Sequence, residues 1–301
     1  MLNLKRSANL NVQQLYTFRE VYERGGYATA AAESNLSVAT IWQHIRALEN
    51  SYEVKLFKRA GRKVVATPAA KELYQAIDEI LVNLESTFDL VNRESSDALP
   101  IRLVTGNRML WEDLAEPLSV FRGTHDNRLI LRHGNDRRAE ELLKEDAADI
   151  ALSLEPGPER ISPLIHYEPG YFVDFLAAVP KRHPFTKSSC SLKELVKYPL
   201  IVSAAGTHGR DTLDHALHRE RLTANVAVET DNSGFTIACV QAGMGIGVLA
   251  GRHDGLLCSK LATRSLRRQL GRRQIVFMWR KGRRLTEPML RLVELIIEHR
   301  A

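Results

Sequence analysis

The chain is poor in cysteine and has no long apolar run. Its three cysteines, Cys190, Cys239 and Cys258, are widely spaced, and none lies in a Cys-x-x-Cys motif. Such a set predicts neither a disulfide framework nor a thiolate metal cage, and it fits a reducing compartment. No stretch approaches the roughly 18 apolar residues of a membrane span, and the first residues lack the apolar core of a signal peptide. We therefore expect a cytoplasmic protein with no membrane-bound part and no metal or other cofactor.

Acidic residues are absent from one segment near the C-terminus. Residues 260–284 carry ten lysines and arginines and no aspartate or glutamate, and residues 1–66 carry ten basic residues against five glutamates. Two basic blocks therefore flank a body that is acidic on balance. At 44% apolar and 26% charged residues, the chain is globular and long enough for two or three cores. A basic block near the end of a chain is typical of phosphate binding, although such runs often form only a solvated face.

Three helices are predicted within the first basic block. Asn11 followed by Gln14 is typical of a capping box, and apolar residues then recur at helical spacing up to a Gly-Gly stop. An alanine-rich second helix covers residues 27–34, and the Ser37 hydroxyl is expected to cap a third helix. A tight turn between the second and third helices indicates a helix-turn-helix.

The third helix is expected to have one buried and one exposed face. Ile41, Ile45 and Leu48 recur at helical spacing and form the buried stripe. The neighbouring face carries a small, an aromatic, an amide and a guanidinium side chain, those of Ala39, Trp42, Gln43 and Arg46. Such a face suits a major groove, where the tryptophan ring can pack against a thymine methyl group. Alternatively, Trp42 fills the gap between helices, because tryptophan is usually largely buried.

A basic hairpin is predicted directly after these helices. Two β-prone runs, residues 54–57 and 64–67, are joined by a turn with Gly61 at its tip. Its cationic side chains can reach phosphates beside the third helix, which makes the whole a winged helix. The predicted DNA contacts are Ser37, Val38, Ala39, Thr40, Trp42, Gln43, His44, Arg46, Arg59, Arg62 and Lys63.

A long helix without glycine or proline is predicted after Pro68. Its apolar positions recur at spacings of three and four residues, which leaves an apolar seam on a lone helix. Pairing with the same helix of a second chain buries that seam, so we expect a homodimer or homotetramer; the alternative is packing on its own body. The predicted dimerisation residues are Leu73, Ile77, Ile80, Leu84 and Phe88.

Strands and helices alternate from residue 101 onward, after a predicted hinge at 94–100. This rhythm predicts doubly wound sheets that bind ligands at the carboxyl ends of their strands. The predicted fold is α/β, with a winged helix-turn-helix, a long linker helix and a C-terminal domain of two α/β lobes. The expected boundaries are 1–67 for the DNA-binding domain, 68–96 for the linker, 97–172 with 274–301 for the first lobe, and 173–273 for the second.

The N-terminal segments resemble those of LysR-type transcriptional regulators. LYTFREVYERGGYATAAAESNLS, IRALE and LFKRAGRKVVATPAA follow one another as in that family, most closely up to about residue 90. The resemblance implies a dimerising linker helix and a periplasmic-binding-protein-like effector domain. The chain departs from the family at Val38, Ala39, Trp42 and Gln43, where Gln, Pro, Ser and Arg are usual. These changes indicate an unusual DNA readout and favour a Trp42 that faces DNA.

Two strand-to-helix turns, TGNR in the first lobe and SAAGTHGR in the second, are the predicted effector site. Helix N-termini offer unpaired N–H groups, so we expect an anion, with Arg108 and Arg210 as clamps. Alternatively, both arginines are only solvated. The resemblance also implies that Asn232 and Ser233 lie close by. The predicted effector-binding residues are Thr105, Gly106, Asn107, Arg108, Ser203, Thr207, Gly209, Arg210, Asn232 and Ser233.

These features predict a sequence-specific DNA-binding transcriptional regulator that responds to a small molecule and is not an enzyme. Its expected partners are operator DNA, a small-molecule effector and further copies of the chain, with RNA polymerase as a further candidate. The alternative is a small-molecule-binding protein or enzyme with basic ends and no specific DNA recognition, which the hairpin beside the third helix argues against. His208, His215 and His218 are interpreted as a solvated face and not as metal ligands.

Overall fold

The computed structural model describes residues 10–60, 63–91, 99–252, 255 and 259–300. The chain forms two compact units, Met1–Phe88 with Lys281–Arg284 and Asp89–Arg280 with Leu285–Ala301. Arg62, the side chain of Lys63 and positions 94–98 of the predicted hinge lie outside the described residues. No helix in the described ranges is long and apolar enough to cross a membrane.

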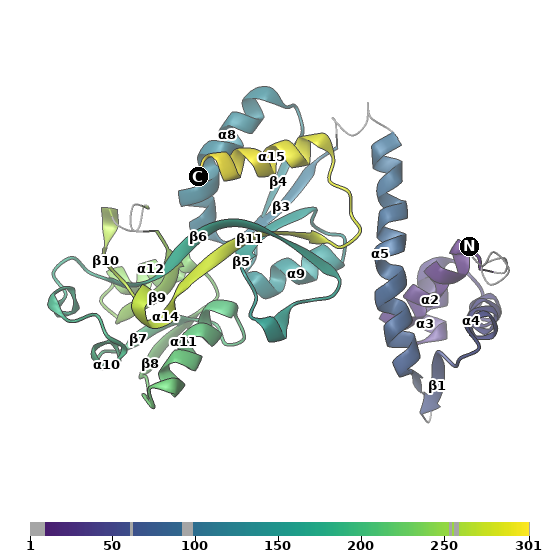
Figure 1. The fold of residues 1–301 in the computed structure, drawn as a ribbon, viewed down its shortest axis with the longest axis horizontal. Helices are drawn as coiled ribbons and strands as arrows, with labels where there is room; N and C mark the ends of the chain where they lie inside the picture. The colour runs from purple at the N-terminus through teal and green to yellow at the C-terminus, as the bar shows by residue number, and fades with distance from the viewer. Residues whose placement is uncertain (1–9, 61–62, 92–98, 253–254, 256–258, 301) are drawn as a thin grey trace. The chain divides into compact units, whose positions relative to one another are not determined.

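The first unit contains the three predicted helices, a hairpin and a long helix (Figure 1). The predicted capping box is present, because Asn11 Oδ1 accepts the Gln13 N–H at 2.8 Å and Gln14 Oε1 accepts the Asn11 N–H at 3.2 Å. Its elements are α2 (Val12–Arg24), α3 (Tyr27–Ser34), α4 (Val38–Tyr52), β1 (Phe57–Ala60), β2 (Lys63–Ala66) and α5 (Pro68–Val91).

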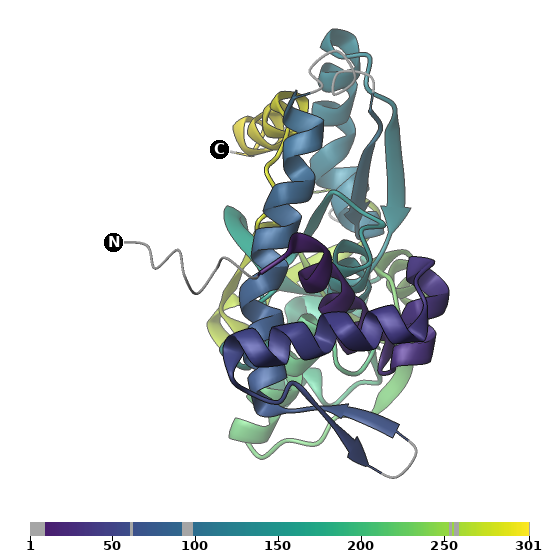
Figure 2. The same cartoon turned by 90° about the vertical axis from the view of Figure 1, so that its right-hand side faces the viewer.

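The hairpin forms, but its first strand begins later than predicted. β1 pairs with β2 from Phe57 opposite Ala66 to Ala60 opposite Lys63. Residues before Phe57 stay outside the ladder because Glu49 Oε1 accepts the Leu56 N–H at 2.9 Å, and the Leu56 side chain is fully buried. The boundary predicted at residue 54 is therefore wrong, and the basic residues Lys58 and Arg59 lie within the strand. Figure 2 shows the hairpin beside α4 at one end of α5.

Helix α5 divides its apolar side chains between a core and the surface. Leu73 and Ile77 belong to the cluster that Phe18, Ile41 and Leu48 build under the helix-turn-helix, and Ile77 is 3% exposed. The other seam positions are exposed, namely Ile80, Leu84 and Phe88. The predicted seam is thus not one continuous outer face.

The second unit is a mixed sheet covered by helices. In the described chain the sheet has the order β4-β3-β5-β11-β6-β9-β7-β8, with β10 paired to β6. Its strands are β3 (Ile101–Thr105), β4 (Leu129–His133), β5 (Ile150–Leu154), β6 (Ile165–Val179), β7 (Leu200–Ser203), β8 (Val226–Thr230), β9 (Ile246–Gly251), β10 (Ala262–Ser265) and β11 (Arg272–Arg280). Its main helices are α7 (Asn107–Met109), α8 (Ala115–Thr124), α9 (Asp136–Lys144), α10 (Leu192–Leu195), α11 (His208–Arg219), α12 (Ser233–Gln241), α14 (Arg267–Leu270) and α15 (Glu287–Glu298), with a π-helical turn at Leu110–Leu114.

Two lobes share this sheet. In the first lobe β3 runs parallel to β4 and β5, and in the second β7 runs parallel to β8 and β9. The long strands β6 and β11 pair antiparallel to each other and join the lobes (Figure 1). This arrangement places the carboxyl ends of the parallel strands of both lobes toward a common cleft.

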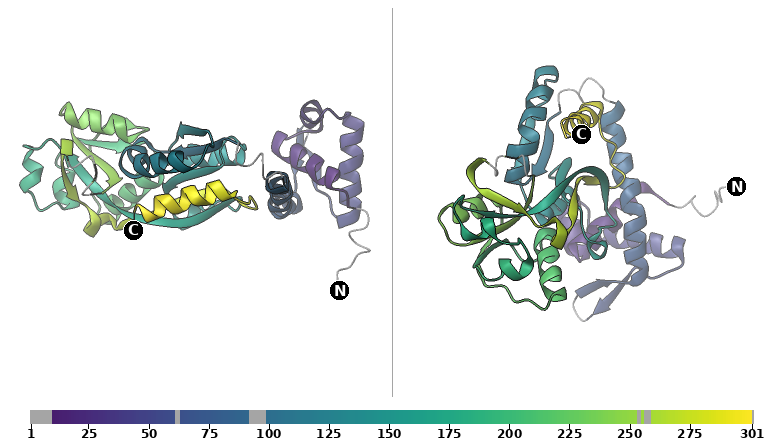
Figure 3. Two further views of the ribbon diagram at one scale, coloured as in Figure 1. Left: turned by 90° about the horizontal axis from the view of Figure 1, so that it is seen from above. Right: turned by 60° about the vertical axis from the view of Figure 1, so that its left-hand side comes forward.

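Separate cores support the lobes. Phe121, Phe277 and Leu292 belong to the core of the first lobe, and Phe175 and Phe185 to that of the second. Helix α15 runs alongside α8 and returns the C-terminus to the first lobe, as Figure 3 shows.

Candidate nucleic-acid interface and ligand cleft

The outer face of α4 carries the side chains that the sequence assigned to DNA. Ser37 Oγ caps this helix by accepting the Thr40 N–H at 3.0 Å. Ile41, Ile45 and Leu48 are buried, and the adjoining face is exposed to solvent. The exposed residues on that face are Val38, Ala39, Trp42, Gln43 and Arg46.

Trp42 lies on the surface and does not fill the core. Its side chain is 48% exposed, and the Arg46 guanidinium carbon lies 4.6 Å from the centre of its ring. The contact is a cation–π pair between residues one helical turn apart, which restricts both side chains. The alternative that Trp42 plugs the gap between helices is therefore wrong for this structure.

Three predicted DNA contacts, Ser37, Thr40 and His44, make hydrogen bonds within the protein. His44 is partly buried, and its Nδ1 lies 2.8 Å from Thr17 Oγ1 of α2. The Thr40 hydroxyl lies 2.8 Å from Ser37 Oγ at the start of α4. His44 therefore fixes α4 against α2, and any contact it makes with DNA stays a prediction.

A cleft separates the two lobes of the second unit. The cavity between them has a volume of about 150 Å³. It is lined by eight of the ten predicted effector residues, Gly106, Arg108, Ser203, Thr207, Gly209, Arg210, Asn232 and Ser233, and also by apolar side chains such as Leu154 and Phe175. Thr105 and Asn107 are not among the described residues that line it. Thr105 is 3% exposed, and its Oγ1 has no hydrogen-bond partner among the described residues.

The lobes touch at one edge of the cleft where α7 meets α12. The backbone N–H of Arg108 donates to Ser233 Oγ at 3.1 Å, and Asn107 Nδ2 lies 3.5 Å from Asn232 Oδ1. Asn232 also caps α12 by accepting the Phe235 N–H at 3.0 Å. The predicted neighbourhood of TGNR with Asn232 and Ser233 is thus present.

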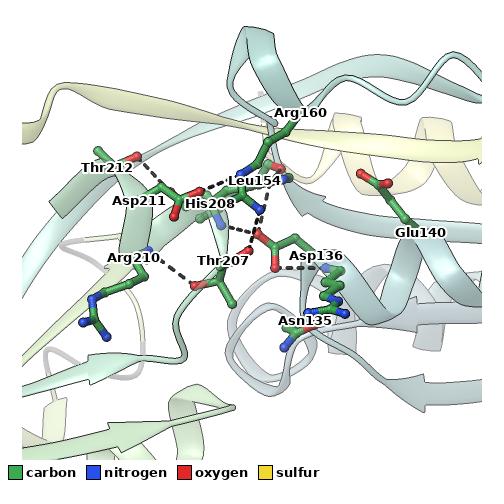
Figure 4. Close-up of polar contacts among 12 residues, drawn as sticks. Asn135, Asp136, Glu140, Leu154, Arg160, Thr207, His208, Arg210, Asp211 and Thr212 are labelled. Atoms are coloured by element: carbon green, nitrogen blue, oxygen red, sulfur yellow. Dashed lines mark hydrogen bonds and ion pairs between the residues drawn. The ribbon is translucent and has the colours of Figure 1, made fainter. Parts of the chain in front are cut away.

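The lobes also touch where α9 meets α11. The Asp136 carboxylate accepts the backbone N–H of His208, and its Oδ2 lies 3.1 Å from His208 Nδ1 (Figure 4). Nearby, Arg160 Nε lies 2.7 Å from Asp211 Oδ2. His208 is 8% exposed, so its place on a solvated face was wrongly predicted, while His215 and His218 are exposed as expected. The described residues contain no group of three or more potential metal ligands.

Both predicted anion clamps are already paired with carboxylates. Arg210 Nε lies 2.9 Å from Asp214 and its Nη1 lies 2.9 Å from Glu229. Burial alone would lower the pKa of Arg210, but these two acids outweigh burial and raise it. The alternative that the arginines are merely solvated is wrong, and their contact with an effector stays a prediction.

Arg108 belongs to a buried ionic cluster beneath the cleft. It is 5% exposed, and its Nη1 lies 3.0 Å from Glu112 and 3.1 Å from Asp113. Asp113 is fully buried, accepts the Tyr171 hydroxyl at 2.7 Å and lies 3.4 Å from Arg300 Nε. Burial, followed by the charge of Asp113, raises the pKa of Tyr171, so this hydroxyl keeps its proton.

Several of these residues could not be found from sequence patterns. Asp136 is the first residue of α9, and only the fold brings its carboxylate to the start of α11. The partners Asp113, Tyr171 and Arg300 lie far apart in the sequence, and the π-helical turn that carries Glu112 and Asp113 has no recognised pattern. An acid, a tyrosine and an arginine at such separations could not be grouped without the topology.

Two segments, which together cover most of the described chain, match known protein families. Residues 12–71 match the bacterial regulatory helix-turn-helix protein, lysR family, and residues 101–301 match the LysR substrate binding domain. The chain belongs to the LysR family. It is a DNA-binding transcriptional regulator with an effector-binding domain, which confirms the predicted family, fold class and general function.

Related LysR regulators cover most of the chain. The chain is 29% identical to the HTH-type transcriptional regulator cbl of Escherichia coli (strain K12), over 82% of this chain and 79% of that protein. It is 27% identical to the HTH-type transcriptional regulator SsuR of Burkholderia cenocepacia, over 80% and 79%. These relatives are transcriptional regulators and not enzymes.

Solved structures share the fold. The crystal structure of the cofactor-binding domain of the Cbl transcriptional regulator matches with a TM-score of 0.59 at 24% identity, over 67% of this chain and 89% of that one. OxyR of Corynebacterium glutamicum matches with a TM-score of 0.56 at 21% identity, over 96% of this chain and 92% of that one.

Proposed function

We propose that this LysR regulator recognises its operator through α4, with Trp42 and Gln43 on base edges and methyl groups. The single observation that carries the proposal is the half-exposed Trp42 ring held by Arg46 on the surface of a capped helix. An exposed tryptophan costs free energy in water, and a thymine methyl group or sugar edge would cover it. Gln43 beside it can form paired hydrogen bonds to adenine.

The hairpin supplies charge beside this face. Arg59 lies on β1, and its neighbours along that strand, Lys58 and Ala60, are exposed with it. Contacts from such residues go to phosphates, so they set affinity for any duplex and leave sequence preference to α4. Contacts from Arg62 and Lys63 belong to the same proposal, as do those from Ser37, Val38, Ala39, Thr40 and His44.

Selection from a random duplex library tests this proposal. The full chain should enrich one dyad-symmetric motif, and the Trp42→Ala variant should enrich a relaxed motif or none. A matched control is Trp111→Ala, because Trp111 is similarly exposed, at 50%, but lies in the second unit. Enrichment of the same motif by wild type and Trp42→Ala would show that the ring does not read sequence.

The cleft is proposed as the effector site. Its cavity of about 150 Å³ admits only a small molecule, and its hydroxyl groups from Ser203, Thr207 and Ser233 suit a polar one. An anionic effector stays our prediction, but it rests on these hydroxyls and on helix N-termini, since both arginines are neutralised. The Asp136 carboxylate opposes an anion at the start of α11.

The remaining expectations complete the proposed function. Exposed Ile80, Leu84 and Phe88 on α5 support a homodimer or homotetramer that would bury them. Operator binding places the protein in the cytoplasm, and RNA polymerase is proposed as a partner at the promoter. We propose no catalytic activity, because every assigned feature serves binding.

A further inference from the structure

A second cavity lies in the second unit, and it is larger than the cleft. Its volume is about 550 Å³. Asp174 of β6 lines this second cavity and the next residue, Phe175, lines the cleft; on β9, Gly251 and Ala250 divide in the same way. No described residue lines both cavities. They are therefore separate cavities.

Guanidinium groups gather around the second cavity. Each comes from a different element: Arg252 follows β9, Arg267 begins α14, Arg272 begins β11 and Arg300 follows α15. The fold therefore brings together charges that are distant in the sequence. Like charges that converge on one cavity repel one another unless a counter-charge lies among them. The described charged residues that line it are Arg252, Arg267, Arg272, Arg300 and Asp174.

Asp174 is the one acidic residue among the described residues that line the cavity, against four arginines. It lies opposite Arg272 in the β6–β11 pair, but Arg272 Nε and Asp174 Oδ1 are 3.7 Å apart. Its other oxygen accepts the Ser265 hydroxyl at 3.0 Å. The side chain of Arg267 is exposed, and no described residue forms an ion pair with it. Arg267 can therefore bind a further anion, with Arg272 and its long ion pair beside it.

Apolar surface lies beside these charges. Phe172 shares the Asp174 face of β6 and is 50% exposed, and the Arg272 guanidinium carbon lies 4.8 Å from its ring centre. Ile297 of α15, 36% exposed, also lines the cavity. A guanidinium stacked on an exposed ring offers a flat surface next to hydrogen-bond donors that suit an oxyanion.

We propose that this second cavity binds a small organic dianion that carries a planar ring. Arg267 and Arg272 hold the oxyanion, and Phe172 contacts the ring. This ligand differs from the effector of the cleft, because the second cavity is larger and more positively charged. The arginines of the cleft are neutralised by acids.

The buried ionic cluster connects the two cavities. Tyr171 and Arg300 line the second cavity, and both contact Asp113, which pairs with Arg108 at the cleft. A dianion beside Arg300 competes with Asp113 for that guanidinium. A ligand in the second cavity would therefore change the contacts of Asp113, which also pairs with Arg108 of the cleft.

Titration calorimetry of the full chain with phenyl phosphate tests the proposal, with inorganic phosphate and phenol as partial ligands. We expect phenyl phosphate to bind about threefold or more tightly than phosphate, because the ring adds a stacking contact. Arg267→Gln and Arg272→Gln should each weaken it about tenfold or more, as a charged hydrogen bond is lost. Arg268→Gln is the matched control, because Arg268 is also exposed on α14 but does not line the cavity.

Several outcomes would overturn the proposal. One is no measurable binding of phenyl phosphate, and another is equal weakening by Arg267→Gln and Arg268→Gln. Binding that is lost in Ser203→Ala and kept in Arg267→Gln would place the molecule in the cleft. Equal affinity for phosphate and phenyl phosphate would remove the ring from the ligand class. Arg267 lacks an ion pair among the described residues, so its variant should unfold at the wild-type temperature, which circular dichroism checks.

Discussion

The Asp136 carboxylate lies at the N-terminus of α11, where it accepts the His208 backbone N–H and lies 3.1 Å from His208 Nδ1. Asp136 begins α9 in one lobe and His208 begins α11 in the other, so the contact closes one edge of the cleft. A carboxylate of the chain therefore already takes the position in which the sequence predicts an effector anion. Because Asp136 already interacts with this helix end, an effector anion that binds there gains less free energy.

Replacing Asp136 with its neutral isostere tests that point. Asp136→Asn should bind inorganic sulfate more tightly than wild type, because a like charge leaves the wall of the cleft. The free energy of unfolding should fall by about 1–3 kcal/mol, since the bond to His208 loses its charge. Calorimetry and urea unfolding measure the two effects. Weaker sulfate binding in the variant would mean that anions do not approach this helix end.

Removing the Trp42 ring should weaken operator binding and leave the fold intact. We expect Trp42→Ala to cost about 1–3 kcal/mol in specific binding, with little change in binding to random duplex. The control is His44→Ala, which loses the bond to Thr17 and should lower the unfolding temperature while sequence preference stays. Fluorescence anisotropy and thermal unfolding distinguish the two. If Trp42→Ala unfolds early and its folded fraction binds normally, the ring is structural.

A wing arginine should act through phosphate alone. Arg59→Gln should weaken binding to every duplex and reduce the slope of log affinity against log salt by about 0.9, the value for one released counterion. Arg137→Gln is the control, since Arg137 is exposed on α9 of the other unit. Anisotropy over a range of salt concentrations measures the slope. An unchanged slope with altered sequence preference would assign Arg59 to base contacts.

Two substitutions on α5 should separate assembly from folding. Leu84→Glu places charge on an exposed seam position and should shift the oligomer toward monomer with the fold kept. Ile77→Glu buries an unpaired charge in the core under the helix-turn-helix and should unfold that unit. Sedimentation velocity and circular dichroism give the result. An intact oligomer in Leu84→Glu would exclude this part of α5 from the interface.

The buried ionic cluster should be costly to break. Arg108→Met leaves Asp113 and Glu112 without their shared cation, and we expect a loss of about 3–5 kcal/mol in stability. The pKa of Arg108 bears on this expectation: burial alone lowers it, but Asp113, Tyr171 and Glu112 raise it, so the charge is present at neutral pH. Urea unfolding measures the loss. A variant as stable as wild type would show that the cluster contributes no net stability.

Local patterns predicted the first unit well. The capping residues Asn11 and Ser37 and the stripe of Ile41, Ile45 and Leu48 act within one or two helical turns, so sequence alone carries them. The start of the hairpin was missed because Glu49, on the preceding helix, binds the backbone of Leu56. The α5 seam was predicted incorrectly because the spacing of apolar residues does not show which of them pack into the core of the same chain. Ile77 is one that does.

The cleft was predicted only in outline. Strand-to-helix turns locate it, since parallel strands end at one edge of a sheet. The pairing of Arg108 with Asp113, and of Arg210 with Glu229, depends on which elements the topology brings together. Helix-end electrostatics also could not reveal that Asp136 would come from another lobe to the start of α11.

Nuclease footprinting on the DNA that adjoins its own gene tests the central claim most directly. The full chain should protect a dyad-symmetric segment, and one member of a panel of small anions should change the length of that segment. Trp42→Ala with Gln43→Ala should abolish the protection, and Ser203→Ala should abolish only the response to the anion. Uniform protection of all sequences, or a footprint that the double variant reproduces, would contradict recognition by α4.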